Sequence, residues 1–300
     1  MNTHPLAGIY TAAITPLNED TTPDLDAIPK YLSFLAKRGC HGALLLGTTG
    51  EGPSFSTNER VDIFRAALKV REENPGFRLL AGTGTPSLTE TIQLTQTAFD
   101  LGYEGVVVLP PYYYHQAMTD GLFIWFQEVL NLAVPRDGYL FGYHFPAQSK
   151  VPLTLELLTK LKESFPDQFA GIKDSTGDPK FSVTLGGRFG NDLVVLTGND
   201  ALLSHALNNQ ASGCITAMGN LFSPDLRVVW DAYQQGNAAP DAQGRLNDQR
   251  VILSKYPPFA ASIKGILPHF HDLPRWPVRP PLLPFPEDQI QFAVEDLKRI

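Results

Sequence analysis

One lysine in the sequence is placed where it could act as a nucleophile. Lys173 ends the apolar run FAGIK (169–173), whereas the other lysines lie in polar or helix-like segments, where a solvated surface role is expected. Burial of an ammonium group is costly, so we expect a depressed pKa and an amine that can condense with a ketone. The protonated imine that results is an electron sink for making or breaking a carbon–carbon bond. The alternative is a simple ion pair between Lys173 and a nearby acid such as Asp174.

A glycine-rich segment could bind an anion. LLLGTTGEGPSF (44–55) follows an apolar run and contains three glycines and two threonines within six residues, with Gly47, Thr48 and Thr49 at its start. Free backbone N–H groups and hydroxyls in such a loop can hold a carboxylate or a phosphate. A plain tight turn into a helix is the alternative interpretation.

Two tyrosines follow apolar runs as well. Tyr113 lies in LPPYYYH (109–115) and Tyr143 in YLFGYHFP (139–146). A phenol at the end of a strand can transfer protons to a bound substrate. For a single tyrosine, however, packing as part of an aromatic lining is the more common role.

Motifs for nucleotides and metals are weak. GTGTPS (82–87) lacks the third glycine of a dinucleotide fingerprint. The pair His269-x-His271 has no carboxylate or cysteine partner at a matching spacing, so we interpret it as part of a surface loop flanked by prolines. The sequence therefore predicts no metal site and no nucleotide cofactor.

The composition narrows the classes of function. The chain has 300 residues, 43% of them hydrophobic and 18% charged, with a net charge of −7 and no basic stripe, which argues against a nucleic-acid partner. No run of about 18 apolar residues is present, so we expect no membrane span. Cys40 and Cys214 both adjoin apolar segments and are predicted to be reduced, buried thiols. Together with the lack of a signal-peptide pattern, this predicts a cytoplasmic protein.

The elements that must hold these side chains repeat along the chain. Short apolar runs, typical of strands buried on both faces, occur at 8–14, 42–46, 78–82, 105–109, 139–143, 169–173, 193–197 and 213–216. Amphipathic stretches separate them, and some carry start signals such as the capping box Ser56–Glu59. Eight such units predict a closed (β/α)8 barrel, with a doubly wound open sheet as the competing fold. In such a barrel the reactive groups lie where the strands end.

The last part of the chain departs from this repeat. After a polar break at 236–244 come two helix-like stretches, a proline-rich segment (273–286) and a final short helix. We therefore predict a catalytic barrel over residues 1–235 and a small helical extension over residues 236–300.

At this point the motifs resemble a known family. GTTGEG, PPYYY, Y-x-x-P and GIKDSTGD occur in the order and at the positions found in the dihydrodipicolinate synthase / N-acetylneuraminate lyase family of Schiff-base aldolases. The likeness runs from about residue 7 to about residue 295. It implies a (β/α)8 barrel, a homotetramer built from tight dimers, and no metal or organic cofactor, because the imine itself is the electron sink.

The resemblance also implies roles for individual residues. Lys173 matches the lysine that forms the imine with pyruvate or a related 2-oxo acid, and Tyr143 and Thr48 match the proton relay. Thr49 matches the residue that holds the pyruvate carboxylate, next to Gly47 in the same loop. Tyr113 matches the tyrosine that a partner subunit lends to the relay. Two further positions match the lining of the pocket, Gly198 and Ile215.

The chain departs from the synthase pattern at the second substrate. Gln148 replaces an arginine that binds the carboxylate of aspartate semialdehyde, and glutamine lacks a charged, bidentate donor pair. Lys150 is nearby and offers a looser substitute. His144 replaces a common asparagine, and Asp200 falls where the sialic-acid lyases have a hydroxyl-binding acid.

We therefore predict reversible aldol chemistry between pyruvate and an aldehyde, with a 2-keto-3-deoxy-type acid as the joined compound. The alternatives are dihydrodipicolinate synthase of lysine biosynthesis, a sugar-acid dehydratase of the same family, and a non-catalytic paralogue that binds a 2-oxo acid.

Overall fold

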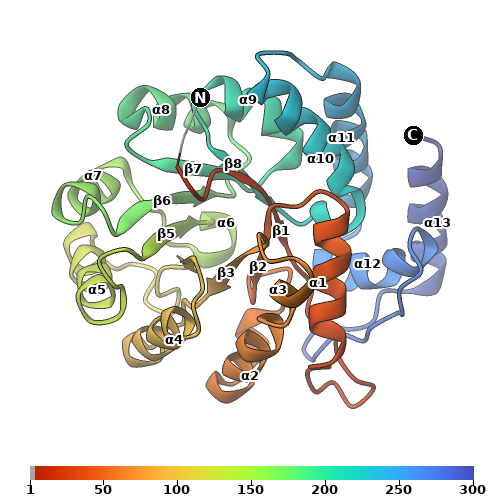
Figure 1. Cartoon of the computed structure of the whole chain (residues 1–300), viewed down its shortest axis with the longest axis horizontal. Coiled ribbons are helices and arrows are strands. Elements are labelled where there is room, and N and C mark those ends of the chain that lie inside the picture. The colour runs from red at the N-terminus through yellow and green to blue at the C-terminus, as the bar shows by residue number, and fades with distance from the viewer. Residues whose placement is uncertain (1–3) are drawn as a thin grey trace.

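The computed structural model describes residues 4–300 and forms a closed barrel of parallel strands (Figure 1). Each strand pairs with the next along the chain, and β8 pairs with β1 to close the ring. The predicted (β/α)8 barrel is thus confirmed, and the open sheet is excluded. The strands are β1 (Gly8–Ala12), β2 (Gly42–Leu45), β3 (Arg78–Gly82), β4 (Gly105–Val108), β5 (Tyr139–His144), β6 (Phe169–Asp174), β7 (Val194–Thr197) and β8 (Gly213–Thr216).

Helices surround the barrel on its outside (Figure 1). Ser56 caps α2 in the predicted capping box, where its hydroxyl accepts from the N–H of Glu59 and the Glu59 carboxylate accepts from the N–H of Ser56. The α-helices are α1 (Ala27–Lys37), α2 (Thr57–Ala67), α3 (Val70–Glu73), α4 (Leu88–Asp100), α5 (Thr119–Ala133), α6 (Pro146–Ser149), α7 (Leu155–Ser164), α8 (Pro179–Phe189), α9 (Leu203–Asn208), α10 (Gly219–Gln234), α11 (Pro240–Leu253), α12 (Phe259–Ile266) and α13 (Glu287–Lys298). Residues 4–300 also contain three short 3₁₀ turns, which are η1 (Gly52–Ser54), η2 (Asp200–Leu202) and η3 (Leu267–His269).

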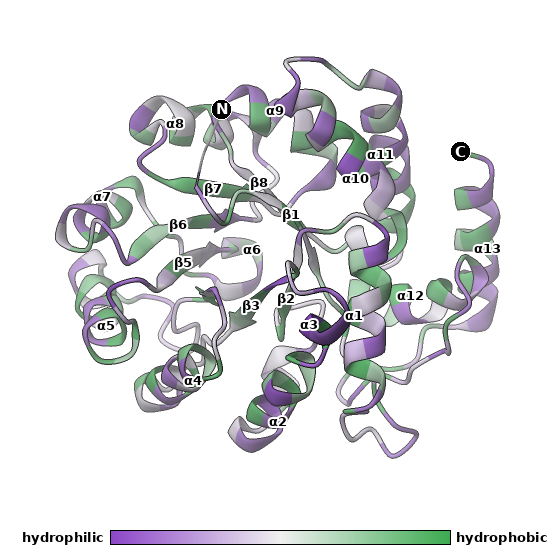
Figure 2. Cartoon of the chain, viewed as in Figure 1, coloured by the Kyte–Doolittle hydropathy of each residue, from purple (hydrophilic) through white to green (hydrophobic). Residues whose placement is uncertain are grey.

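Apolar side chains fill both the barrel and the space between barrel and helices. Inward-pointing residues such as Tyr10, Leu44, Leu80 and Phe141 pack into one cluster inside the barrel. In Figure 2 the outer helices carry hydrophobic and hydrophilic residues side by side, as expected for helices with one buried face. Within residues 4–300 no helix is long and apolar enough to cross a membrane.

The register of β5 and β6 brings two predicted site residues together. Leu140 lies opposite Phe169, but Phe141 lies opposite Gly171, so the pairing shifts by one residue at this point. Beyond the shift, Tyr143 is the direct partner of Lys173. Their side chains therefore point to the same face, which is the inside of the barrel.

Helices α11, α12 and α13 follow the barrel and lie on the side of α10 and α1 (Figure 1). The predicted boundary at 235/236 falls between α10 and α11, and the division into two domains remains a prediction. Helix α11 begins at Pro240, inside the segment predicted to be a polar break. The reason is local, because proline suits the first position of a helix and Asp241 favours the first turn.

Candidate active site

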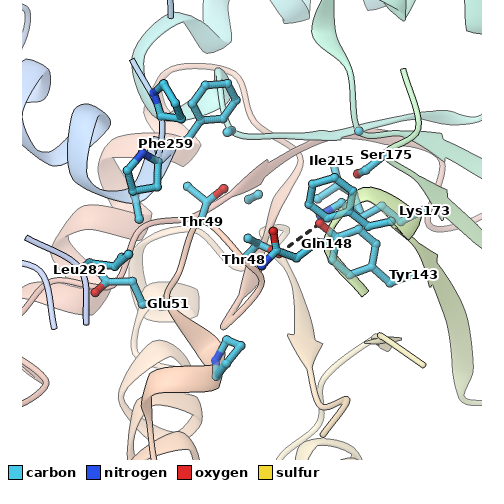
Figure 3. Close-up of a pocket in the computed structure, with 18 of the residues that line it drawn as sticks. Thr48, Thr49, Glu51, Tyr143, Gln148, Lys173, Ser175, Ile215, Phe259 and Leu282 are labelled. Carbon is cyan, nitrogen blue, oxygen red and sulfur yellow. Dashed lines mark hydrogen bonds between the residues drawn. The ribbon is translucent and has the colours of Figure 1, made fainter. Parts of the chain in front are cut away.

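A cavity of about 580 Å³ opens at the carboxyl ends of the strands (Figure 3). Its walls come from the barrel strands, the loop after β2, α6 and the C-terminal extension. Predicted site residues that line it are Thr48, Thr49, Tyr143, Gln148, Lys173, Gly198 and Ile215. One cavity thus gathers predicted site residues that are up to 167 positions apart in the chain, from Thr48 to Ile215.

Lys173 projects into this cavity from β6 and is only 3% exposed. Its Nζ lies 4.0 Å from the centroid of the Tyr143 ring. Asp174 follows on the same strand, so its side chain points to the other face, where Oδ1 accepts from the N–H and hydroxyl of Thr176. Within residues 4–300 Lys173 makes no ion pair with Asp174. The alternative interpretation, in which Lys173 only neutralises that acid, is therefore wrong.

Tyr143 joins Lys173 to the loop after β2. Its ring stacks on Phe145 with centroids 5.8 Å apart. Its hydroxyl lies 3.4 Å from Oγ1 of Thr48, a long contact that Figure 3 draws as a dashed line. An amine, a phenol and a hydroxyl are therefore adjacent, an arrangement that can transfer protons around a group bound to Lys173.

Residues of the loop after β2 differ in how they relate to the cavity. Thr49 is buried, lines the cavity and has no hydrogen-bond partner for its hydroxyl among residues 4–300, so this hydroxyl is available to a ligand. Gly47 does not line the main cavity; its carbonyl accepts from the N–H of Gly52 and closes the turn. Glu51 adopts a left-handed conformation (φ 57°) and lines the cavity, but its side chain is fully buried.

The Glu51 carboxylate pairs with a lysine from the C-terminal extension. Lys264 of α12 is 1% exposed, and its Nζ lies 2.5 Å from Oε1 of Glu51 and 2.7 Å from the carbonyl oxygen of Pro277. The expectation of a solvated surface role is thus wrong for Lys264. Burial lowers the pKa of Lys264, and the Glu51 charge counteracts this shift.

Gly198 is required by its surroundings. A Cβ at this position would lie 2.0 Å from Oγ of Ser175, so any larger residue would displace a neighbour that also lines the cavity. Its N–H donates to the carbonyl of Asp174, which connects the loops after β6 and β7. Ile215 of β8 provides an apolar wall next to Lys173 (Figure 3).

The synthases have an arginine where this chain has Gln148, and a helix of the C-terminal extension supplies a different arginine to the cavity. Gln148 of α6 lines the cavity, but Lys150 does not; its Nζ donates to the carbonyl of Ala147 and its side chain is exposed. Instead, Arg250 of α11 lines the cavity. The possible compensation by Lys150 is therefore not present, whereas an arginine is supplied from a distant part of the chain.

Asp200 lies behind this arginine rather than on the cavity wall. It is fully buried, and its Oδ1 accepts from Nη1 of Arg250 at 3.0 Å, while Oδ2 has no partner among the described residues. Burial raises the pKa of Asp200, and Arg250 counteracts this effect. The structure thus does not bring this predicted hydroxyl-binding acid to the cavity, because η2 turns its carboxylate toward α11.

Tyr113 also lies away from the cavity. It is 73% exposed in the segment after β4 and packs edge-on against Tyr114, with ring centroids 5.3 Å apart. A contribution of Tyr113 to a neighbouring subunit remains a prediction.

His144 follows Tyr143 but faces the outside of the barrel. Its Nδ1 accepts from the N–H of Leu153 at 2.9 Å, and its ring packs on Phe181. Burial lowers its pKa to about 4, so the ring is neutral at neutral pH. His144 therefore orders the segment after β5 and does not enter the cavity.

Other titratable groups lie apart from the cavity. Cys40 and Cys214 are buried, as predicted, and burial raises the pKa of both thiols. His271 contacts the carbonyl of Leu221, and His269 is exposed in η3. In the described part of the chain, no cluster of three or more His, Cys, Asp or Glu residues could hold a metal ion.

The sequence interpretation missed Arg250, Lys264 and the role of Glu51. Arg250 and Lys264 belong to helix-like stretches without a recognisable motif. Glu51 lies inside GTTGEG, so the only available signal was its place in that motif.

Known proteins resemble the chain over nearly its whole length. The model of the family described as "Dihydrodipicolinate synthetase family" matches residues 5–300. An "uncharacterized DapA-like lyase" of Chloroflexus aurantiacus is 38% identical over 296 residues, covering 98% of this chain and 96% of the relative. A 4-hydroxy-tetrahydrodipicolinate synthase of Corynebacterium urealyticum is 33% identical over 232 residues, or 77% of this chain and 74% of that protein.

A solved structure agrees with these sequences. YagE, a prophage protein of the dihydrodipicolinic acid synthase family from E. coli K12, was crystallised with pyruvate. Its TM-score to this chain is 0.91 at 25% identity, with 98% of each chain covered. Sequence and structure comparisons thus point to the same family.

Proposed function

Because the chain belongs to the dihydrodipicolinate synthetase family of lyases, we propose that it makes or breaks a carbon–carbon bond between pyruvate and an aldehyde through an imine on Lys173. The observation that carries this proposal is a buried lysine amine 4.0 Å from a tyrosine ring, inside a cavity of about 580 Å³. The joined compound is a 4-hydroxy-2-oxo acid, which includes the 2-keto-3-deoxy acids.

In the synthetic direction the Lys173 amine attacks the ketone carbon of pyruvate, and loss of water gives the imine. Removal of a methyl proton converts the imine to an enamine, whose carbon attacks the aldehyde and forms the new bond. The aldehyde oxygen takes up a proton, and water then releases the product and restores the amine. Cleavage follows the same steps in reverse.

The cavity offers a group for each proton transfer. The Tyr143 hydroxyl is the proposed donor and acceptor, because its ring lies beside the Lys173 amine and the hydroxyl itself lies next to that of Thr48. Thr49 is the proposed ligand of the pyruvate carboxylate, with its free hydroxyl and the backbone N–H groups of the loop.

We further propose a homotetramer in the cytoplasm in which Tyr113 reaches a neighbouring active site. The support is an exposed segment with three large side chains that are at least 73% exposed: Tyr113, Tyr114 and Met118. Such a patch is typical of an interface. Light scattering of the wild type and a Tyr113→Ser variant tests this proposal, and a monomeric wild type contradicts it.

Dihydrodipicolinate synthase activity is a second candidate, favoured by the relative from Corynebacterium urealyticum. Gln148 in place of the arginine argues against it, because an uncharged amide binds the carboxylate of aspartate semialdehyde less tightly.

Intact-mass spectrometry after treatment with pyruvate and borohydride tests the imine. The wild type is expected to gain the mass of one reduced pyruvate, and Lys173→Ala is expected to gain none. Lys150→Ala is a matched control, because Lys150 is an exposed lysine on a neighbouring element. An unmodified, folded wild type overturns the proposed chemistry, and an adduct without turnover on any aldehyde favours a non-catalytic binding protein.

A further inference from the structure

Arg250 lies at the far end of the cavity from Lys173. It belongs to α11, lines the cavity, and its guanidinium carbon lies 5.1 Å from the centroid of the Phe259 ring. Figure 3 shows Phe259 and Leu282 at one end of the cavity and Lys173 and Tyr143 at the other. A substrate that reaches both ends therefore contacts the imine with one end and the guanidinium with the other.

Within the described part of the chain, one hydrogen bond holds the Arg250 guanidinium in place and leaves its other N–H donors unused. Nη1 donates to Oδ1 of Asp200, and among residues 4–300 this is the only hydrogen bond that the guanidinium makes. The Arg250 side chain is 24% exposed. Arginine has five N–H donors, so it can bind a second acceptor from the cavity while it keeps Asp200.

The charges on the cavity wall indicate which acceptor this is. Among the residues that the structure describes, three charged ones line the cavity: Glu51, Lys173 and Arg250. Glu51 is occupied on both oxygens, by Nζ of Lys264 and by the N–H of Arg279. The Lys173 amine is already bonded to pyruvate in the proposed imine. The free N–H groups of Arg250 are thus the available cationic site, and their planar arrangement matches a carboxylate.

The charged residues that line the cavity also argue against an amino group on the aldehyde substrate. An ammonium group would need an anionic partner, and the only carboxylate on the described cavity wall is already paired. The expected substrate is therefore not an amino-acid semialdehyde, which would carry such an ammonium group.

Apolar residues form much of the wall at the end near Phe259, and Glu51, which lies beside Leu282 in Figure 3, has both carboxylate oxygens paired. At this end the cavity is lined by Pro257, Pro258, Phe259, Pro281 and Leu282. A polyhydroxylated chain would leave hydroxyl groups without partners against such a surface, whereas an alkyl or aromatic chain would not.

From these observations we propose that Arg250 binds a terminal carboxylate of the aldehyde substrate, and that an apolar chain without an amino group joins this carboxylate to the aldehyde. The inference rests on the proposed function, because it names the partner that reacts with the pyruvate enamine. Asp200 is a positioning residue here, since it orients Arg250 and does not line the cavity.

A purely structural role for Arg250 is the rival explanation. The Arg250–Asp200 pair also connects α11 to the loop after β7. However, Gln243 of the same helix donates to the carbonyl oxygens of Asp200 and Ala201, so this connection does not depend on Arg250 alone. A structural role would affect stability and all substrates alike.

The test compares matched acidic and neutral aldehydes with pyruvate as the common partner. The pairs are 4-formylbenzoate with benzaldehyde, and succinic semialdehyde with butanal. The wild type is expected to prefer the acid in each pair. Arg250→Met is expected to lower kcat/KM for the acids by about ten- to a hundredfold, because a hydrogen bond to a charged group is lost, and to change the neutral aldehydes by less than about twofold. Arg250→Lys is expected to fall between the two.

Arg245→Met is the matched control. Arg245 lies on the same helix, pairs with Asp225 on the surface and does not line the cavity. It is expected to leave both substrate classes unchanged. Thermal unfolding of each variant monitors stability.

Three results would overturn the inference: equal losses on acids and neutral aldehydes in Arg250→Met, a wild type that prefers the neutral aldehydes, or no turnover of either acid by an enzyme that forms the imine. Borohydride trapping of pyruvate on Arg250→Met separates the two proposals. If the imine does not form on the wild type, the proposed function fails; if it forms on both proteins without acid selectivity, only the role of Arg250 fails.

Discussion

The ammonium group of Lys264 lies 2.5 Å from Oε1 of Glu51, in a buried contact that connects α12 to the loop after β2. Oε2 of Glu51 accepts from the N–H of Arg279, which lies in the proline-rich segment. The loop that carries Thr48 and Thr49 is therefore held by the C-terminal extension. This extension also supplies part of the cavity wall and is not only a support on the outside of the barrel.

Loss of Lys264 is expected to be strongly destabilising. Lys264→Met leaves the Glu51 carboxylate buried without its partner, which lowers the free energy of unfolding by about 3–5 kcal/mol. It also loosens the Thr49 loop, so the KM for pyruvate should rise. Urea unfolding and steady-state kinetics measure the two effects.

The pair Lys160–Asp120 provides a control, since its Nζ–Oδ1 distance is 2.7 Å but both side chains are exposed. Lys160→Met should cost at most about 1 kcal/mol. Addition of Glu51→Gln to Lys264→Met should restore part of the stability, because the unpaired charge is removed. Equal effects of Lys264→Met and Lys160→Met would contradict the importance of the buried pair.

Removal of the Tyr143 hydroxyl is expected to separate imine formation from turnover. In Tyr143→Phe the ring beside Lys173 remains, so borohydride should still trap pyruvate. Turnover should fall by about 10²- to 10⁴-fold, since a positioned proton donor is lost. Thr48→Val should have a smaller effect, because its contact with the phenol is long, at 3.4 Å, and Thr48→Ser should retain activity. An unchanged kcat in Tyr143→Phe would remove the tyrosine from the mechanism.

His144 is expected to make the protein less stable in acid. Its pKa is lowered by burial from 6.5 to about 4 in the folded protein, so the unfolded chain binds a proton first as the pH falls. The stabilising contribution is therefore present above pH 6.5 and is lost as the pH falls from about 6.5 toward 4. Between pH 7 and pH 5 the loss from this residue is about 2 kcal/mol.

His144→Asn should remove that loss, because the amide oxygen can still accept from the N–H of Leu153 but does not titrate. Urea unfolding at pH 7 and pH 5 compares the two proteins. Since other histidines whose pKa is lowered, such as the partly buried His41, also titrate, the variant should flatten the pH dependence only in part. The same pH dependence in variant and wild type would argue against this origin.

Gln148 allows a test of the second substrate. Gln148 lines the cavity, so Gln148→Arg adds a charged, bidentate donor at the position where the synthases have one. Activity with aspartate semialdehyde and pyruvate is expected to increase about tenfold. Gln148→Lys adds the charge without the bidentate geometry and should give a smaller gain. No gain with arginine would contradict the prediction that the side chain at position 148 contacts the second substrate.

The sequence by itself was enough to predict the barrel and to single out Lys173. All eight apolar runs became strands within two residues of their predicted ends, because a strand buried on both faces needs such a run whatever its neighbours are. Lys173 could be recognised because it is a charged residue at the end of one of these runs. The start of α2 was equally local, since Ser56 and Glu59 cap each other across three residues.

The tertiary structure alone decided the rest of the cavity. Glu51 and Lys264 are 213 positions apart, and Asp200 and Arg250 are 50 apart. No periodicity or local motif marks such pairs, because they meet only when the closed barrel and the folded C-terminal extension bring distant segments together. For the same reason Asp200 lies behind Arg250 and Lys150 lies outside the cavity: the direction of a side chain beyond the end of a strand depends on the packing of the loop that carries it.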